Sequence, residues 1–157
     1  MSSMTMSRAT STTTGTRLTA AIALLGRFPR SLQQLVFRLA VGSVFFKAGL
    51  TKITSWDTTV ALFRDEYQVP VFPPEMAAGL AATFELGCSA LLIVGLATRL
   101  ASVPLLGMLL VIQLFVYPSA WAEHLTWGGI LIALLTRGAG AASLDRLLRI
   151  EPPAVDP

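Results

Sequence analysis

The sequence is poor in charged residues and in the side chains that ligate metals. Only 13% of its 157 residues are charged, and it has one cysteine and one histidine. Cys88 therefore has no partner within the chain for a disulfide or a CxxC pair, and a lone histidine cannot supply bis-histidine haem ligation. We expect no metal site, and no cofactor held covalently or by metal ligation within this chain alone.

Apolar residues are abundant instead: they make up 54% of the chain, and the mean hydropathy is +0.66. They come in long blocks rather than short alternating stretches, which favours helices over a β-barrel. Four blocks approach the ~20 residues that cross a ~30 Å hydrocarbon core: residues 32–51, 76–98, 100–117 and 120–137. We predict an all-α integral membrane four-helix bundle whose first partner is the lipid bilayer.

The rest of the chain completes the expected domain organisation. Residues 1–17 are rich in Ser and Thr and predict a disordered tail, and residues 18–31 predict an amphipathic juxtamembrane segment. The membrane domain covers residues 32–151 and includes a short cytoplasmic helix over 144–150, which Ser143 would cap. Residues 152–157 form a flexible tail.

Lys and Arg are distributed unevenly around the four blocks. With four spans, one side holds Arg8, Arg17, Arg27, Arg30, Arg99, Arg137, Arg146 and Arg149. The other side holds only Lys52 and Arg64. The positive-inside rule then places both termini in the cytoplasm and the 52–75 loop outside. These scattered, flanking cations account for the formal charge of +3, so no nucleic-acid partner is expected.

The outward loop contains an amphipathic stripe. Trp56, Val60, Phe63 and Tyr67 recur at helical spacing, which predicts a helix lying in the membrane interface. Membrane anchoring explains the stripe because Trp and Tyr favour the headgroup level. The alternative is a lid over a ligand, formed by Trp56, Phe63 and Tyr67.

Charged side chains also lie inside the predicted spans. A charge at mid-bilayer costs roughly 2.5 to 3.5 kcal/mol, so Arg38 and Glu85 should face the bundle interior. Counting helix rise from the outer surface puts them level to within one turn, which predicts an intramembrane Arg38–Glu85 pair. Such a pair either locks two helices together or takes part in ligand or proton chemistry.

A second group of polar residues is expected nearer the outer surface. Lys47 can extend towards that interface, where Lys52, Gln113 and His124 should lie at similar depth. These four residues form a candidate polar cluster for ligand binding.

Three stretches together resemble the DoxX family of small four-span bacterial membrane proteins, over about residues 32–149. The first is RLAVGSVFFKAGLTKI, with Arg38, Gly42, Gly49 and Lys52. The second is ELGCSALLIVGLATR, with Glu85, Gly95, Thr98 and Arg99. The third is RGAGAASLDRLL, with Gly138, Gly140, Ser143, Leu144 and Asp145.

The resemblance implies a bacterial inner-membrane protein, from a family named after a quinone-linked thiosulfate oxidation system. We therefore expect the membrane subunit of a quinone-linked redox or stress-related complex, which acts with a protein partner and takes quinone as its ligand. One alternative is a noncatalytic anchor or assembly partner for a peripheral protein. A small-solute or lipid carrier ranks last, since four spans without a repeat would have to oligomerise.

Overall fold

The computed structural model describes residues 19, 23 and 28–150. In this part of the chain every regular element is helical, as the apolar blocks predict. The elements are α2 (Arg30–Thr54), α3 (Trp56–Leu62), the π-helical η1 (Phe63–Tyr67), α4 (Pro74–Val94), α5 (Thr98–Val111), the π-helical η2 (Ile112–Val116), α6 (Trp121–Arg137) and α7 (Leu144–Leu147). The tails expected at 1–17 and 152–157, and most of the segment expected at 18–31, lie outside the described residues.

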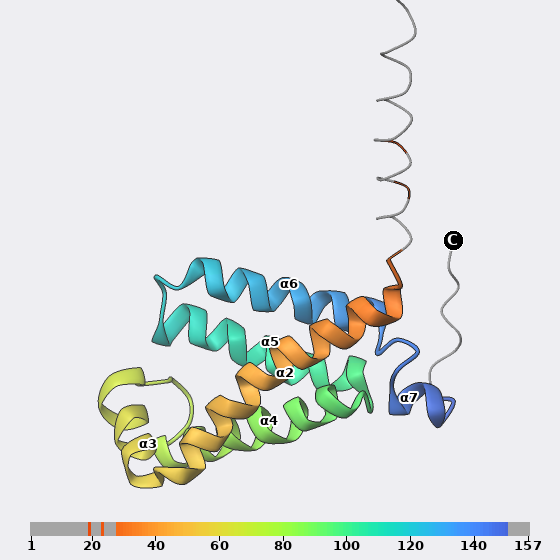
Figure 1. Ribbon diagram of the computed structural model, residues 1–157. Helices are drawn as coiled ribbons and strands as arrows, with labels where there is room; N and C mark the ends of the chain where they lie inside the picture. Colours follow the sequence, from red (N-terminus) through yellow and green to blue (C-terminus); the bar gives the residue numbers. More distant parts are fainter. Residues whose placement is uncertain (1–18, 20–22, 24–27, 151–157) are drawn as a thin grey trace, which may run out of the picture. The chain divides into compact units, whose positions relative to one another are not determined.

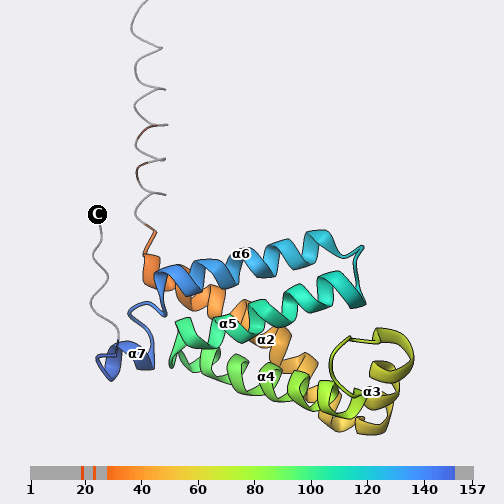
Figure 2. The same cartoon turned by 180° about the vertical axis from the view of Figure 1, so that it is seen from behind.

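The described residues from Ser31 onwards form one compact unit, in which α2, α4, α5 and α6 pack around a common apolar core. The core residues are Val41, Phe45, Leu92, Ala101, Leu105, Leu109, Leu131 and Leu134. Helix α5 contacts both α4 and α6, and the view from behind in Figure 2 shows it between them. In Figure 1, α3 lies at one end of the bundle and α7 at the other.

Two glycines fix the register of α2 against α4. A Cβ atom at Gly42 would lie 2.8 Å from Cγ1 of Ile93, and one at Gly49 would lie 2.9 Å from Cβ of Glu85. Neither position has room for a side chain, so the two backbones approach closely, as small residues allow in membrane helices. Gly49 and Glu85 are therefore at the same level of the bundle.

Two of the predicted spans have the length and composition to cross a membrane: Pro74–Val94, and Thr98–Val116 across α5 and η2. Both are apolar outside as well as inside, with Leu80, Phe84 and Leu110 exposed. A helix that is hydrophobic all round requires an apolar environment on every side. Membrane crossing by α2 and α6 stays a prediction.

The turn between α4 and α5 corrects the predicted boundary at residue 98. Helix α4 ends at Val94 because Gly95 caps it in the left-handed conformation (φ 73°), which glycine adopts without a Cβ clash. Ala97 is also left-handed (φ 49°), and α5 begins at Thr98. The C-terminal helix expected over 144–150 likewise ends early, at Leu147.

The amphipathic stripe of residues 56–67 is helical, as predicted, but its buried face contacts protein. Val60 and Phe63 are buried against Ala77 and Ala78 of α4, whose small side chains permit close packing. Trp56 remains 39% exposed. Val60 and Phe63 thus pack against α4, while interfacial anchoring of the stripe stays a prediction.

Candidate functional site

A cavity of about 630 Å³ lies between α4, α5 and the segments that follow α3. This volume is within the range of roughly 300 to 1,000 Å³ that is usual for small-molecule sites. One wall comes from α4 at helical spacing: Ala77, Leu80, Ala81, Phe84 and Glu85. The facing wall comes from α5 and η2 at the same spacing: Pro104, Gly107, Met108, Val111, Ile112 and Phe115. Helix periodicity thus turns one face of each helix towards the cavity.

An ion pair supplies polar atoms to this apolar cavity. Lys52 Nζ donates a hydrogen bond to Glu85 Oε1 at 2.8 Å and lies 2.7 Å from Oε2. The second contact is close in distance but makes no hydrogen bond, and no described residue donates one to Oε2. The Glu85 side chain is 2% exposed, and that of Lys52 is 21% exposed. Both oxygens of the buried Glu85 carboxylate thus lie within 3 Å of the Lys52 ammonium group, and both residues line the cavity.

The predicted Arg38–Glu85 pair is wrong: Glu85 pairs with Lys52. The depth count assumed that the end of α2 and the start of α4 lie at the same level of the membrane. Helix α4 instead begins beyond the end of α2, because Gly79 faces Trp56, which follows α2. Glu85 thus lies opposite Gly49, one turn before Lys52.

Arg38 is buried at the other end of the bundle. Its guanidinium group occupies the space that a side chain at Gly95 would fill, and its Nη2 donates a hydrogen bond to the carbonyl oxygen of Ala142. Gly95 is ten residues beyond Glu85, or about 15 Å along a helix. Arg38 therefore connects α2 to the turn after α4 and to the C-terminal segment.

Asp145 closes this same end. Its carboxylate accepts hydrogen bonds from the backbone N–H groups of Ala97 at 2.7 Å and Thr98 at 3.1 Å, the first turn of α5. Its own N–H donates to the carbonyl oxygen of Gly95 at 2.9 Å. A carboxylate suits this position because the N-terminus of a helix presents unpaired N–H groups and a positive dipole.

Two tyrosines, Tyr67 and Tyr117, line the cavity. The hydroxyl oxygens of Tyr67 and Tyr117 lie 3.4 Å apart, which is longer than a strong O–H···O hydrogen bond. Burial raises the pKa of Tyr67, and the hydrogen bond to Tyr117 and the negative charges nearby, including Glu85, raise it further. Of the predicted lid residues, Phe63 and Tyr67 line the cavity and Trp56 does not.

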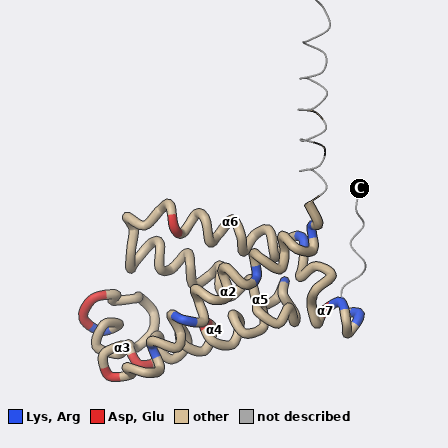
Figure 3. Tube along the Cα trace, viewed as in Figure 1, with Lys and Arg blue, Asp and Glu red and all other residues tan. Residues whose placement is uncertain are grey.

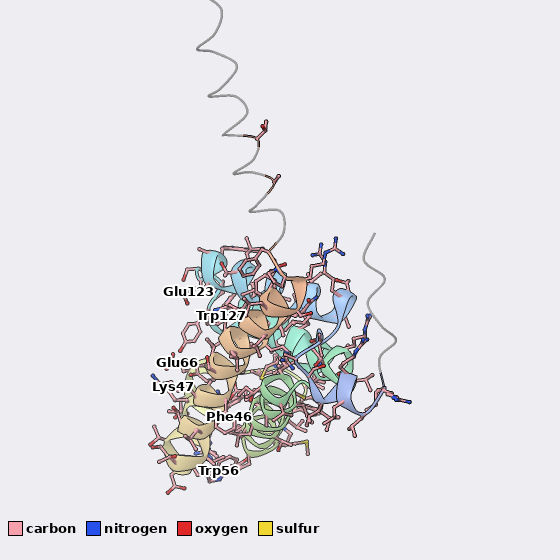
Figure 4. All side chains as sticks on the ribbon, turned by 45° about the vertical axis from the view of Figure 1, so that its right-hand side comes forward. Phe46, Lys47, Trp56, Glu66, Glu123 and Trp127 are labelled. Carbon is pink, nitrogen blue, oxygen red and sulfur yellow. The ribbon has the colours of Figure 1, made fainter. Side chains whose placement is uncertain are left out.

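The predicted outward cluster does not form a single site. Gln113 Oε1 lies 2.5 Å from Nδ1 of His124, and Gln113 Nε2 donates to the carbonyl oxygen of Pro118, so these two residues join η2 to the start of α6. Lys47 is exposed on α2, as Figure 4 shows. Only Lys52 of the four lines the cavity.

Sequence reasoning did not assign Tyr117 or Asp145 to a site, although Asp145 stood in the third family motif. Tyr117 ends an apolar block and carries no signal of its own. Asp145 had a signal, since it falls in the first turn of a predicted helix, but its partners at Ala97 and Thr98 are distant in sequence. Both residues reach their positions only through the packing of α5 and α7 against other elements.

The described part of the chain is helical, and two of its helices are long and apolar enough to cross a membrane. The chain matches the DoxX family over residues 33–118, more than half of its length, and it belongs to that family. Comparisons with curated proteins and with solved structures find no match. The matched region contains Lys52 and Glu85, whereas Asp145 lies beyond it.

Proposed function

We propose that the chain is the membrane subunit of a quinone-linked redox or stress-related complex, and that its cavity receives the quinone ring at Lys52 and Glu85. One observation carries the proposal: an ammonium–carboxylate pair, of which the carboxylate is buried, provides polar atoms to a cavity with otherwise mostly apolar walls. A quinone fits this combination because its ring is apolar and its carbonyl oxygens accept hydrogen bonds. The functional role that sequence analysis considered for Arg38 and Glu85 thus passes to Lys52 and Glu85.

The ion pair has hydrogen-bonding capacity left for a ligand. An ammonium group has three donors, and Lys52 gives one to Glu85 Oε1, so a second can reach a quinone carbonyl oxygen. An ionised carboxylate has more lone pairs than the contacts with Lys52 use, so Glu85 can also accept a hydrogen bond from a quinol hydroxyl group. The pair therefore suits both redox forms, and Glu85 is the group proposed to exchange a proton with the ligand.

Reduction of a quinone to a quinol takes two electrons and two protons. The proposed source of the electrons is a flavin or iron–sulfur cofactor of a partner protein, because the cysteine and histidine content of this chain does not provide for its own cluster or bis-histidine haem. In this role the chain binds and positions the quinone, and the partner supplies the redox centre.

We also propose four spans in a bacterial inner membrane, with both termini cytoplasmic. The charge distribution supports this arrangement: acidic residues cluster around α3 at one end of the bundle, and basic residues around α7 at the other (Figure 3). The positive-inside rule assigns the basic end to the cytoplasm. Lys52, Glu85 and the cavity then lie in the outer half of the protein.

Quinone binding by the purified protein in nanodiscs tests the function. Titration with a quinone should quench tryptophan fluorescence in the wild type, and Lys52→Met or Glu85→Gln should weaken binding by about tenfold or more, since each removes a charge-assisted hydrogen bond. Arg64 and Glu75 form a matched control, because they make an ion pair of 3.1 Å that is exposed and does not line the cavity. Arg64→Met and Glu75→Gln should bind quinone like the wild type.

Equal affinity in all folded variants would remove Lys52 and Glu85 from the site. A folded wild type that binds no quinone, and that co-purifies with a peripheral protein, would favour the noncatalytic anchor instead.

A further inference from the structure

The cavity is a trough between the two helices that have the composition of membrane spans. Its walls repeat at helical spacing along α4 and α5, so the space extends along the helices. Leu80, Phe84 and Phe115 line it and are nevertheless 38 to 49% exposed. The trough is therefore open along the outer surface of α4 and α5, where hydrocarbon surrounds a spanning helix.

Gly107 creates a gap in one wall of the trough. It lies in α5, lines the cavity and is exposed, and a Cβ atom built on it would meet no atom within 4 Å. Close helix packing, which explains Gly42 and Gly49, does not explain this glycine. Pro104, one turn earlier on the same face, also lines the cavity.

We propose that this trough is a lateral binding site for the apolar tail of a membrane-resident amphiphile, which leaves the cavity past Gly107 into the hydrocarbon. The inference rests on the proposed function and narrows its ligand to a quinone with a prenyl tail, as opposed to a water-soluble one. The polar ring lies at Lys52 and Glu85, and the tail follows the apolar faces of α4 and α5. A ligand of this kind enters from the bilayer and never crosses the aqueous phase.

Two ring-matched quinones, one without a tail and one with a prenyl tail, test the site in nanodiscs. Gly107→Leu places a branched side chain in the trough, and leucine is a better helix former than glycine, so the variant should fold. The variant should bind the tailed quinone about tenfold more weakly or worse, because several buried methylene groups of the tail lose their contacts. Its affinity for the tailless quinone should fall far less. Comparing each probe between variant and wild type cancels its partitioning into the bilayer.

Gly87→Leu is the matched control. Gly87 is also exposed, also lies within a membrane-length helix, and also has no atom within 4 Å of a built Cβ, but it does not line the cavity. This variant should bind both quinones like the wild type.

The possible failures are distinguishable. Equal affinity of Gly107→Leu and wild type for the tailed quinone, or an equal loss for both probes, overturns the tail site while Lys52 and Glu85 remain the ring site. A wild type that binds neither quinone overturns the proposed function together with the tail site.

Discussion

Buried charges occur at both ends of the bundle, in different surroundings. At the α7 end, Asp145 accepts hydrogen bonds from two backbone N–H groups, and Arg38 donates one to a backbone carbonyl group. At the α3 end, Lys52 and Glu85 meet each other and line a cavity. The first end uses charge to join chain segments. The second end places a charged pair in the wall of a cavity, which is the arrangement that the proposed ligand site uses.

This contrast explains why burial alone is a poor guide to function. Arg38 is as buried as Glu85, and both exposed fractions are 1%. The difference lies in the surroundings, since Arg38 donates to the carbonyl oxygen of Ala142, whereas Glu85 pairs with Lys52 in the wall of a cavity. Substitutions at the α7 end should therefore lower stability without changing quinone affinity. Substitutions of Lys52 or Glu85 should weaken quinone binding.

The largest effect on stability is expected from Asp145→Ala. The change removes a charged acceptor from the N–H groups of Ala97 and Thr98, and it should lower the unfolding free energy by roughly 2 to 4 kcal/mol. Denaturation in detergent measures this loss. Asp145→Asn should lose less, because an amide oxygen can still accept one of the two hydrogen bonds. Quinone affinity of the folded protein should not change; a loss of affinity without a loss of stability would break the comparison.

Lys52→Met should have a smaller effect on stability, about 2 kcal/mol, because it leaves Glu85 without its cation but next to a cavity. The double variant Lys52→Met/Glu85→Gln should recover to within about 1 kcal/mol of the wild type, since both charges are gone. Quinone binding should nevertheless stay weak in the double variant. Recovery of binding together with stability would mean that the pair is structural, like the α7 end.

The surface pair Arg64 and Glu75 provides the stability control for the single and double variants of Lys52 and Glu85. Both side chains are more than half exposed, so removing the pair should change the unfolding free energy by less than about 0.5 kcal/mol.

The smallest effect is expected from Tyr67→Phe. Because the two tyrosine hydroxyls lie 3.4 Å apart, their contact is weak, and its loss should cost less than about 1 kcal/mol. Burial raises the pKa of Tyr67, so its contribution to stability is complete below the ordinary value of about 10 and falls as pH rises above it. The chain has only two tyrosines, so an ultraviolet pH titration can follow them. Tyr67→Phe should remove a transition that lies above the ordinary tyrosine pKa of about 10. Persistence of that transition in the variant would contradict the assignment.

Much of the helical framework was predictable, because apolar blocks and their breakers act locally. Blocks ending near Gly138, or beginning near Pro74, give helices at nearly those positions. The boundary at residue 98 was missed because the left-handed turn at Gly95 and Ala97 interrupts a run that remains apolar. The family was also readable from motifs, and Lys52 and Glu85 both stood among them.

The sequence by itself determined the helical class, the DoxX family and the presence of charges within apolar segments, since these follow from composition and local order. Only the tertiary structure decided which charges meet. Gly49 brings Glu85 against α2 one turn before Lys52, and the early start of α4 moves Arg38 towards Gly95 and Ala142. The physical reason is that the register between two helices depends on where their backbones can approach, and depth counted along each helix separately contains no such information.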